Sequence, residues 1–305
     1  MAQEKPGLQT RIEKGQSLLL AEAPAPKNGD GAAARELARR FKGKVHALGI
    51  SDNRDETRMS ALAAAALTAL EGVEPILHIV TRDRNRIALI SDCLGAQGLG
   101  IRNVLCTSGS HQTLGKFRKA KSVYDIDVIQ LLKTLGGLDG DGAILGESGF
   151  AGAGNLCLGA VAAPYADPLE MQLIRLAKKI QAGARFLVTQ PVFDLERFAS
   201  WWKAVTEKGM EKKTAFVAGV RVLTSAEIAT ACANRRPSME IPEALVARIT
   251  SASGAAAQRQ AGMLLAIETI QELSALKGLR GFEISGGDDD KAALEVIEKS
   301  GLKAD

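Results

Sequence analysis

The sequence predicts an α/β protein of the (β/α)8 class, a TIM barrel folded as a single domain. Eight short runs of apolar and β-branched residues alternate along the chain with longer amphipathic segments. These runs are apolar at nearly every position, as strands buried on both faces of a parallel sheet must be. Eight such repeats favour a closed barrel over an open sheet. No low-complexity linker divides the 305 residues.

The first half of the chain contains four expected strand and helix pairs. A turn at Pro24–Asp30 follows the first of these strands, and a loop of polar residues, Asp52–Arg58, follows the second. Residues 1–15 precede the first strand and are expected to form an N-terminal extension. The expected strands are Ser17–Ala23, Lys44–Ser51, Glu74–Val80 and Asn103–Thr107, and the expected helices are Ala32–Phe41, Met59–Leu70, Asp83–Leu99 and Val128–Leu135.

The second half of the chain repeats the pattern after a glycine-rich stretch, Gly136–Gly154. Two or three helical segments are expected between Ser225 and Leu276, ahead of the last strand. The remaining expected strands are Leu156–Ala162, Arg185–Thr189, Thr214–Val220 and Gly281–Ile284, and the remaining helices are Pro168–Ala182, Leu195–Lys208 and Lys291–Ser300.

The turn after the first expected strand argues against an open dinucleotide-binding sheet. Such a sheet requires a glycine-rich turn at this point, where backbone N–H groups hold a pyrophosphate. This chain has Ala23-Pro24-Ala25-Pro26-Lys27 instead, and it contains no P-loop and no GxSxG motif. The barrel is therefore the favoured architecture.

Composition and charge exclude several classes of function. The formal net charge is +4 and aromatic residues make up 4% of the chain, so a nucleic-acid groove is not expected. No run approaches the roughly 18 apolar residues of a membrane span, and the N-terminus lacks the apolar segment of a signal peptide, which indicates a cytoplasmic protein. No metal site or iron–sulfur cluster is expected, because the cysteines lie far apart without a CxxC pair: Cys93, Cys106, Cys157 and Cys232.

Polar residues at the C-terminal ends of the expected strands are the candidates for a site, because the active residues of barrels come from that end. Glu22 follows an apolar run; burial would raise its pKa and make it a general acid, or it is a rim glutamate paired with a Lys or Arg. His78 lies within a strand and is typical of a hydrogen-bonded core histidine. Gln190 could hydrogen-bond a planar heterocycle or close the barrel rim. The small residues of Thr107–His111 would let backbone N–H groups approach a ligand.

Other polar groups have structural explanations. Asp125 and Asp127 precede a helix, where N-capping accounts for them. The basic run Lys116–Lys121 could meet phosphates or a glutamate tail, but a solvated face is the more common role of such a run.

Several segments of the chain share their order and spacing with one known family. They are Thr57-Arg58-Met59-Ser60, Arg82-Asp83-Arg84-Asn85-Arg86, Leu99–Leu105 leading into Ser108-Gly109, Ala166-Asp167-Pro168-Leu169-Glu170, Lys178–Ala184 and Thr189–Asp194. Together they resemble the methylenetetrahydrofolate reductase family, whose members are (β/α)8 flavoprotein barrels. The resemblance runs from about Glu22 to Asp194 and continues weakly through Ile241-Pro242-Glu243 to the last strand.

The resemblance implies reduction of 5,10-methylenetetrahydrofolate to 5-methyltetrahydrofolate with hydride from a reduced flavin. Glu22 matches the family's proton donor, which helps the five-membered ring of the folate to open to an N5-iminium. On the folate side the resemblance implies contacts from Gln190, Ser110 and His111. The flavin-contacting positions of the family match Ser51, His78, Ser108, Gly109, Tyr124, Asp125 and Lys179.

Departures from the family pattern affect what the resemblance implies. Ser110-His111 stands where the family commonly has an aspartate after the fourth-strand glycine. Ala162-Ala163-Pro164 stands where the family often has polar flavin contacts after the fifth strand, so the expected flavin is either FMN or FAD. Ala21 and Ala23 replace the usual phenylalanines beside Glu22. These changes resemble the short reductases of anaerobic one-carbon metabolism. We therefore expect an oligomer whose electrons come from a diffusible donor or from a partner subunit.

Two other functions fit the same residues. A folate-binding methyltransferase barrel without flavin would use the same pterin-facing groups and would transfer a methyl group with no redox change. A non-catalytic barrel subunit would keep the fold as an assembly surface in a larger complex, and the Ser110 departure is the observation that suggests it.

Overall fold

The computed structural model describes residues 7–54, 56–137, 156–234 and 241–304. Within them, eight parallel strands form a closed barrel in which each strand pairs with its neighbours in chain order and β8 pairs with β1. The predicted (β/α)8 barrel is confirmed. The strands are β1 (Leu18–Pro24), β2 (Ala47–Ser51), β3 (Pro75–Val80), β4 (Asn103–Thr107), β5 (Cys157–Ala162), β6 (Phe186–Thr189), β7 (Ala215–Arg221) and β8 (Gly281–Ser285).

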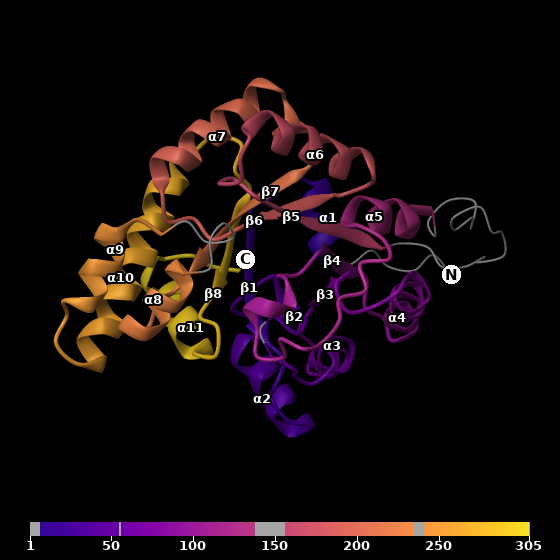
Figure 1. The fold of residues 1–305 in the computed structure, drawn as a ribbon, viewed down its shortest axis with the longest axis horizontal. Helices are drawn as coiled ribbons and strands as arrows, with labels where there is room; N and C mark the ends of the chain where they lie inside the picture. The colour runs from indigo at the N-terminus through magenta and orange to yellow at the C-terminus, as the bar shows by residue number, and fades with distance from the viewer. Residues whose placement is uncertain (1–6, 55, 138–155, 235–240, 305) are drawn as a thin grey trace.

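Helices surround the strands, and those between β7 and β8 group on one side of the barrel (Figure 1). The bounds lie within a few residues of the predicted ones, and residues 138–154 of the predicted glycine-rich stretch fall outside the described residues. The helices are α1 (Gly7–Glu13), α2 (Gly31–Phe41), α3 (Ala61–Leu70), α4 (Arg86–Gly98), α5 (Val128–Gly137), α6 (Leu169–Gln181), α7 (Leu195–Glu207), α8 (Ala226–Ala233), α9 (Glu243–Thr250), α10 (Ala255–Ser274) and α11 (Asp290–Lys299), with short 3-10 turns η1 (Gln112–Leu114) and η2 (Met210–Lys212).

The N-terminal half of the barrel interior is a packed apolar core. Alternate strand residues point inward or outward toward the helices, as the pleat of a strand requires. The outward-facing residues pack on the helices in a second, larger cluster that includes Trp201, Trp202 and Phe216. Because the inner cluster fills the N-terminal half in the described residues, the C-terminal ends of the strands are the end left for a ligand. The inner cluster consists of Leu8, Leu18, Leu20, Ala47, Ile76, Leu105, Cys157, Phe186, Val188, Ala215 and Val217.

Part of the expected N-terminal extension forms α1, which closes the N-terminal end of the barrel. Leu8 of this helix is fully buried in the inner cluster. Its backbone N–H donates to both carboxylate oxygens of Glu74 at 3.1 Å, and Asn103 Nδ2 donates to Glu74 Oε1 at 2.7 Å. The helix is therefore an integral part of the barrel, and the opposite end remains for a site.

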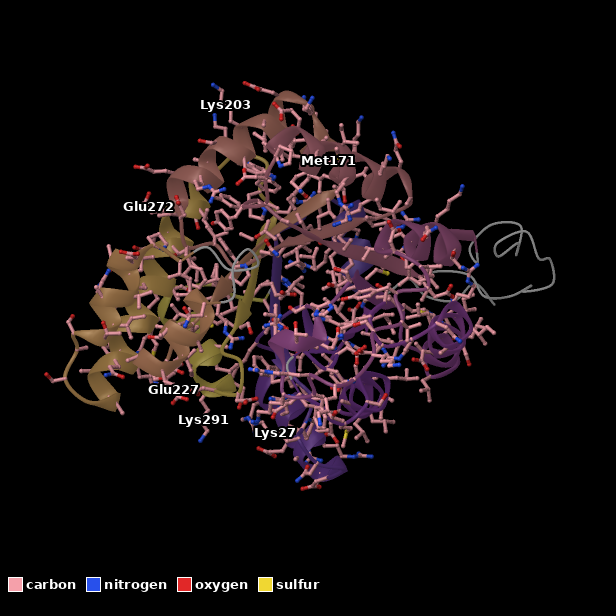
Figure 2. All side chains as sticks on the ribbon, in the orientation of Figure 1. Lys27, Met171, Lys203, Glu227, Glu272 and Lys291 are labelled. Carbon is pink, nitrogen blue, oxygen red and sulfur yellow. The ribbon has the colours of Figure 1, made fainter. Side chains whose placement is uncertain are left out.

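Charged side chains lie on the outer face of the helices (Figure 2). Figure 2 labels charged side chains at the periphery, among them Lys203 of α7 and Glu272 of α10. In the part of the chain that the structure describes, no helix is long and apolar enough to cross a membrane.

Candidate functional site

Glu22 lies inside the barrel, toward the C-terminal ends of the strands. Leu18 and Leu20 point into the inner cluster, and the two-residue repeat of β1 places Glu22 on the same side. Its neighbours in the strand register are Gly49 of β2 and Ser285 of β8. The residue is 6% exposed. A carboxyl group is thus held in the interior, next to the apolar core.

Cationic and polar neighbours keep the Glu22 carboxyl ionised. Burial raises the pKa of Glu22, and the charge of Arg54 lowers it. Smaller contributions in the lowering direction come from His78, Arg221 and a hydrogen bond with Ser51, and the pKa falls to about 2. Arg54 Nη2 donates to Glu22 Oε1 at 2.8 Å. At neutral pH Glu22 is therefore a buried carboxylate.

The expectation that Glu22 has a raised pKa and keeps a proton near neutral pH is wrong for this structure, because its net pKa is lowered to about 2. The apolar residues on either side of Glu22 indicate burial from the sequence alone. The cation that neutralises its charge, Arg54, comes from the loop after β2. Glu22 is the acid paired with an arginine, as in the alternative interpretation, although the pair lies inside the barrel. The Arg54 side chain is 39% exposed, whereas that of Glu22 is 7% exposed, so the pair connects the interior to the mouth.

A second carboxyl group, Glu283 of β8, is buried beside Glu22. The register pairs Glu283 with Leu20 of β1 and Gly219 of β7, so it lies one inward-facing position nearer the N-terminal end than Glu22. Burial, followed by the negative charge of Glu22, raises the pKa of Glu283 to about 8. At neutral pH one carboxyl group of the pair is ionised and the other is protonated.

The ring of His78 also faces this interior space. A Cβ at position 49 would lie 2.7 Å from His78 Nε2, so the ring occupies the room that Gly49 leaves. Burial lowers the pKa of His78 to about 4, and the imidazole is neutral at pH 7. Its Nε2 is buried and has no hydrogen-bond partner among the described residues. Such a nitrogen is available to a ligand.

Gln190 follows β6, and hydrogen bonds fix the backbone on both sides of it. Gln190 N donates to Ala162 O at 2.8 Å, and Val192 N donates to Gly219 O at 2.9 Å. Thr189 Oγ1 accepts from Gly219 N at 3.0 Å. The amide oxygen of Gln190 is buried without a partner in the described part of the chain. The C-terminal end of β6, next to β7, thus carries a hydrogen-bond acceptor, Gln190 Oε1, that is open to a ligand.

The loop after β4 is fixed by Arg82. Its Nη1 donates to Ser110 O at 2.8 Å, and its Nη2 donates to Asn53 O at 2.6 Å, which joins this loop to the one after β2. Gly109 has a φ of 73°, and a Cβ there would lie 2.6 Å from a β3 side chain. The structure therefore places the predicted residues Ser108, Gly109 and Ser110 together on a constrained loop at the C-terminal end of the barrel.

Three predicted site residues have exposed side chains outside this cluster. His111 Nδ1 lies 2.8 Å from Thr113 Oγ1. Asp125 accepts hydrogen bonds from the side chain and the backbone N–H of Arg86 at 2.8–2.9 Å. Tyr124 is 41% exposed. Within the described residues, none of the three forms a hydrogen bond or ion pair with the groups around Glu22.

The N-capping expected of the two aspartates before α5 holds for one of them. Asp127 Oδ1 accepts from Gln130 N at 2.7 Å, and Gln130 Oε1 accepts from Asp127 N at 2.9 Å, which is a reciprocal capping arrangement. Asp125 pairs instead with Arg86, whose hydrogen bonds lower its pKa to about 2. It joins the β4–α5 loop to the start of α4.

Lys179 of α6 extends to the end of β5. Its Nζ donates to Val161 O at 2.6 Å, and burial, followed by the charge of Arg175, lowers its pKa to about 8. A cavity beside it has a volume of about 20 Å³, which is room for about one water. This cavity is too small for an organic ligand.

The cysteines are buried, free thiols. Burial raises the pKa of Cys93 to about 12 and raises that of Cys106 well above its usual range. Across the described ranges, no group of three His, Cys, Asp or Glu side chains is placed to hold a metal ion. Thiols of this kind are poor nucleophiles.

Three residues of the cluster were not predicted from the sequence: Arg54, Arg221 and Glu283. Glu283 is an acid between apolar residues of a strand, the same pattern that identified Glu22, so the pattern could have found it. Arg221 ends β7 and donates to a serine hydroxyl of β8 at 3.3 Å, a position that a survey of strand ends would include. Arg54 lies in a polar loop, and nothing in the sequence shows that it folds back.

Replacing Arg54 with Met should raise the pKa of Glu22 by about 1–3 units, because an opposite charge at contact distance lowers a carboxyl pKa by that amount. Carbon-13 NMR titration of labelled glutamate carboxyls measures the shift. Arg58→Met is the control, because Arg58 lies in the same loop but bonds to Glu56 and Asp288. A Glu22 pKa that does not move in Arg54→Met would contradict the assignment of this ion pair.

Comparisons with known proteins agree with the fold and with the resemblance seen in the sequence. The chain is similar in structure to an uncharacterized protein from Clostridium thermocellum that binds two copies of 5-methyl-5,6,7,8-tetrahydrofolic acid, with a TM-score of 0.69 and 13% sequence identity. The match covers 96% of this chain and 98% of that one, and it shows a shared fold. The family model described as methylenetetrahydrofolate reductase matches residues 7–301. The chain therefore belongs to the methylenetetrahydrofolate reductase family.

Proposed function

We propose that this chain catalyses the flavin-dependent reduction of 5,10-methylenetetrahydrofolate to 5-methyltetrahydrofolate, with Glu22 as the proton donor. The observation that carries the proposal is a buried, ionisable cluster around Glu22 in the C-terminal half of a barrel of this family. The similar protein from Clostridium thermocellum binds 5-methyltetrahydrofolic acid, which is the product of this reaction. An oxidoreductase acting on folate is the function that these two findings support best.

The residues present fit a flavin, FMN or FAD, whose ring edge carries both hydrogen-bond donors and acceptors. His78 Nε2 is buried and unpartnered in the described structure, and Gly109 gives the loop after β4 a backbone conformation, with a φ of 73°, that other residues rarely adopt. When bound and reduced, the flavin supplies the hydride. From the family pattern we assign the remaining flavin contacts to Ser51, Ser108, Tyr124, Asp125 and Lys179.

Gln190 is the folate contact that we propose, together with Ser110 and His111. Its Oε1 is a buried acceptor without a partner among the described residues. An unsatisfied buried polar group costs about 1–3 kcal/mol, and a ligand N–H that reaches it recovers this free energy. The pterin ring of a folate offers such N–H donors.

Glu22 must gain a proton before it can donate one. Burial raises the pKa of Glu22, but the charges of Arg54, His78 and Arg221 and the hydrogen bond with Ser51 together outweigh it and hold the pKa at about 2. The Arg54 side chain is 39% exposed, so a ligand entering at the mouth can displace it into water. Burial then dominates, the pKa of Glu22 rises, and the group becomes a general acid near neutral pH.

The reductant that we propose for the flavin is a diffusible donor or a partner subunit of an oligomeric complex. An iron–sulfur cluster bound by this chain would require grouped cysteine ligands, and the sequence contains no CxxC pair. Members of the short family branch that the sequence resembles often work with a partner subunit.

Purified protein should be yellow and should release FMN or FAD on heating, identified by chromatography against standards. Adding 5,10-methylenetetrahydrofolate under anaerobic conditions should reoxidise the reduced protein. A correctly folded, colourless protein that takes up neither flavin would overturn the proposal. It would favour the methyltransferase alternative, which transfers a methyl group from 5-methyltetrahydrofolate to a corrinoid without redox change.

A further inference from the structure

The pair formed by Glu22 and Glu283 is the feature of the interior that the proposed reaction leaves unexplained. Both side chains point into the barrel from neighbouring strands, one inward-facing position apart in the register. Glu22 is 6% exposed and Glu283 is 7% exposed. A reaction that uses one proton donor does not require a second buried acid next to it.

The charges around the pair are distributed unequally. Arg54, from the loop after β2, donates to Glu22 Oε1 at 2.8 Å. Arg221 of β7 and the neutral His78 of β3 complete the titratable or charged groups that act on Glu22. Glu283 Oε1, in contrast, is buried and has no hydrogen-bond partner in the described part of the chain, although the charge of Arg54 also lowers the pKa of Glu283 against the larger raising effects of burial and Glu22.

Two adjacent buried carboxyl groups with this environment cannot both be ionised at low cost. An ionised carboxylate without a partner carries the full penalty of desolvation, and repulsion from its neighbour adds to that penalty. A protonated acid avoids both costs and can donate a hydrogen bond. When two titratable groups have environments that push their pKa values apart, one acts as the acid and the other as the base.

We propose that Glu283 stores the proton that Glu22 delivers to the folate, an inference that rests on the proposed reductase function. When a ligand displaces Arg54, the proton passes from the Glu283 carboxylic acid to the Glu22 carboxylate. Glu22 then gives it to the folate nitrogen whose bond to the bridging carbon breaks, and that nitrogen keeps the electron pair. Glu283 is left as a carboxylate and regains a proton from water. Glu283 is thus a positioning residue for the proton, and Glu22 is the group that contacts the substrate.

The first test is a carbon-13 NMR titration of glutamate carboxyls in the ligand-free protein. One carboxyl should titrate near pH 8 and should be absent from Glu283→Gln. In Glu22→Gln that same signal should move to lower pH, because the neighbouring negative charge has been removed. Glu74, whose pKa burial also raises, is assigned separately with Glu74→Gln. If Glu283→Gln does not fold, the shift of this carboxyl signal to lower pH in Glu22→Gln assigns it to Glu283.

A Glu283 carboxyl that titrates at or below 4.5, the ordinary value for glutamate, would overturn the proposal. This titration needs neither flavin nor folate, so its result is independent of the reductase assignment. A protein that binds no flavin would contradict the proposed function but would not contradict the unequal protonation of Glu22 and Glu283.

The second test is the pH profile of folate reduction by the flavin-loaded protein. Glu283→Gln should lower the rate at pH 7 at least tenfold and should remove the alkaline limb that lies near pH 8 in the wild type. Reduction of the flavin by its donor should not change, since that half-reaction needs no proton from this pair. A profile identical to that of the wild type would show that Glu283 does not supply the proton.

Discussion

Replacing Glu22 with Gln should lower the rate of folate reduction by about 10²–10⁴-fold, the contribution that a general acid makes to catalysis. Gln keeps the shape of the side chain but carries no proton that it can release. Reduction of the flavin by its donor should remain nearly unchanged, because Glu22 is assigned to the folate step alone. Rapid-mixing measurements of the two half-reactions separate these effects.

A structural role for Glu22 predicts a different pattern. Glu22 shares an ion pair with Arg54, and its replacement leaves a cation that is 39% exposed and can turn to water. The barrel should therefore stay folded, which circular dichroism of Glu22→Gln checks. Two half-reactions that slow down together would make Glu22 structural, and unchanged activity of the whole assembly would favour the non-catalytic subunit.

The barrel could be predicted because its requirements are local. A closed parallel sheet needs strands that are buried on both faces, and β3, with every residue of Pro75–Val80 buried, meets this need along its whole length. The role of α1 could not be predicted in the same way. Leu8 lies in the core with its backbone N–H bonded to Glu74, which Asn103 holds in turn, and both of these residues are distant from it in sequence.

The candidate site was predictable where a residue type and a strand position were enough. Glu22, Ser51 and His78 lie around one interior space, as strand ends of a barrel should. Its electrostatics were not predictable, because the pKa of Glu22 depends on where the Arg54 loop places a cation. Asp125 shows the same limit, since its partner is Arg86, a residue 39 positions away.

Replacing Gly262 with Ala should destabilise the protein by about 3 kcal/mol, the upper end of the usual cost of overpacking. Gly262 lies inside α10, where Ala is normally the better helix former. A Cβ there would lie 1.7 Å from Leu223 O, a backbone atom of the segment after β7 that cannot turn aside as a side chain can. Urea unfolding, followed by circular dichroism, measures the loss as a lower midpoint.

Gly95→Ala in α4 is the matched control, because a Cβ there would lie 3.7 Å from Leu62 Cδ2, an ordinary contact. This change should stabilise the protein by up to about 1 kcal/mol, the difference in helix propensity between the two residues. The opposite signs separate packing from propensity, since both substitutions add the same methyl group to a helix. If Gly262→Ala also raised the midpoint, α10 would not approach the segment after β7 as closely as described. Other contacts would then have to support β7. Because β7 carries Arg221, they would also have to hold this part of the positive charge near Glu22.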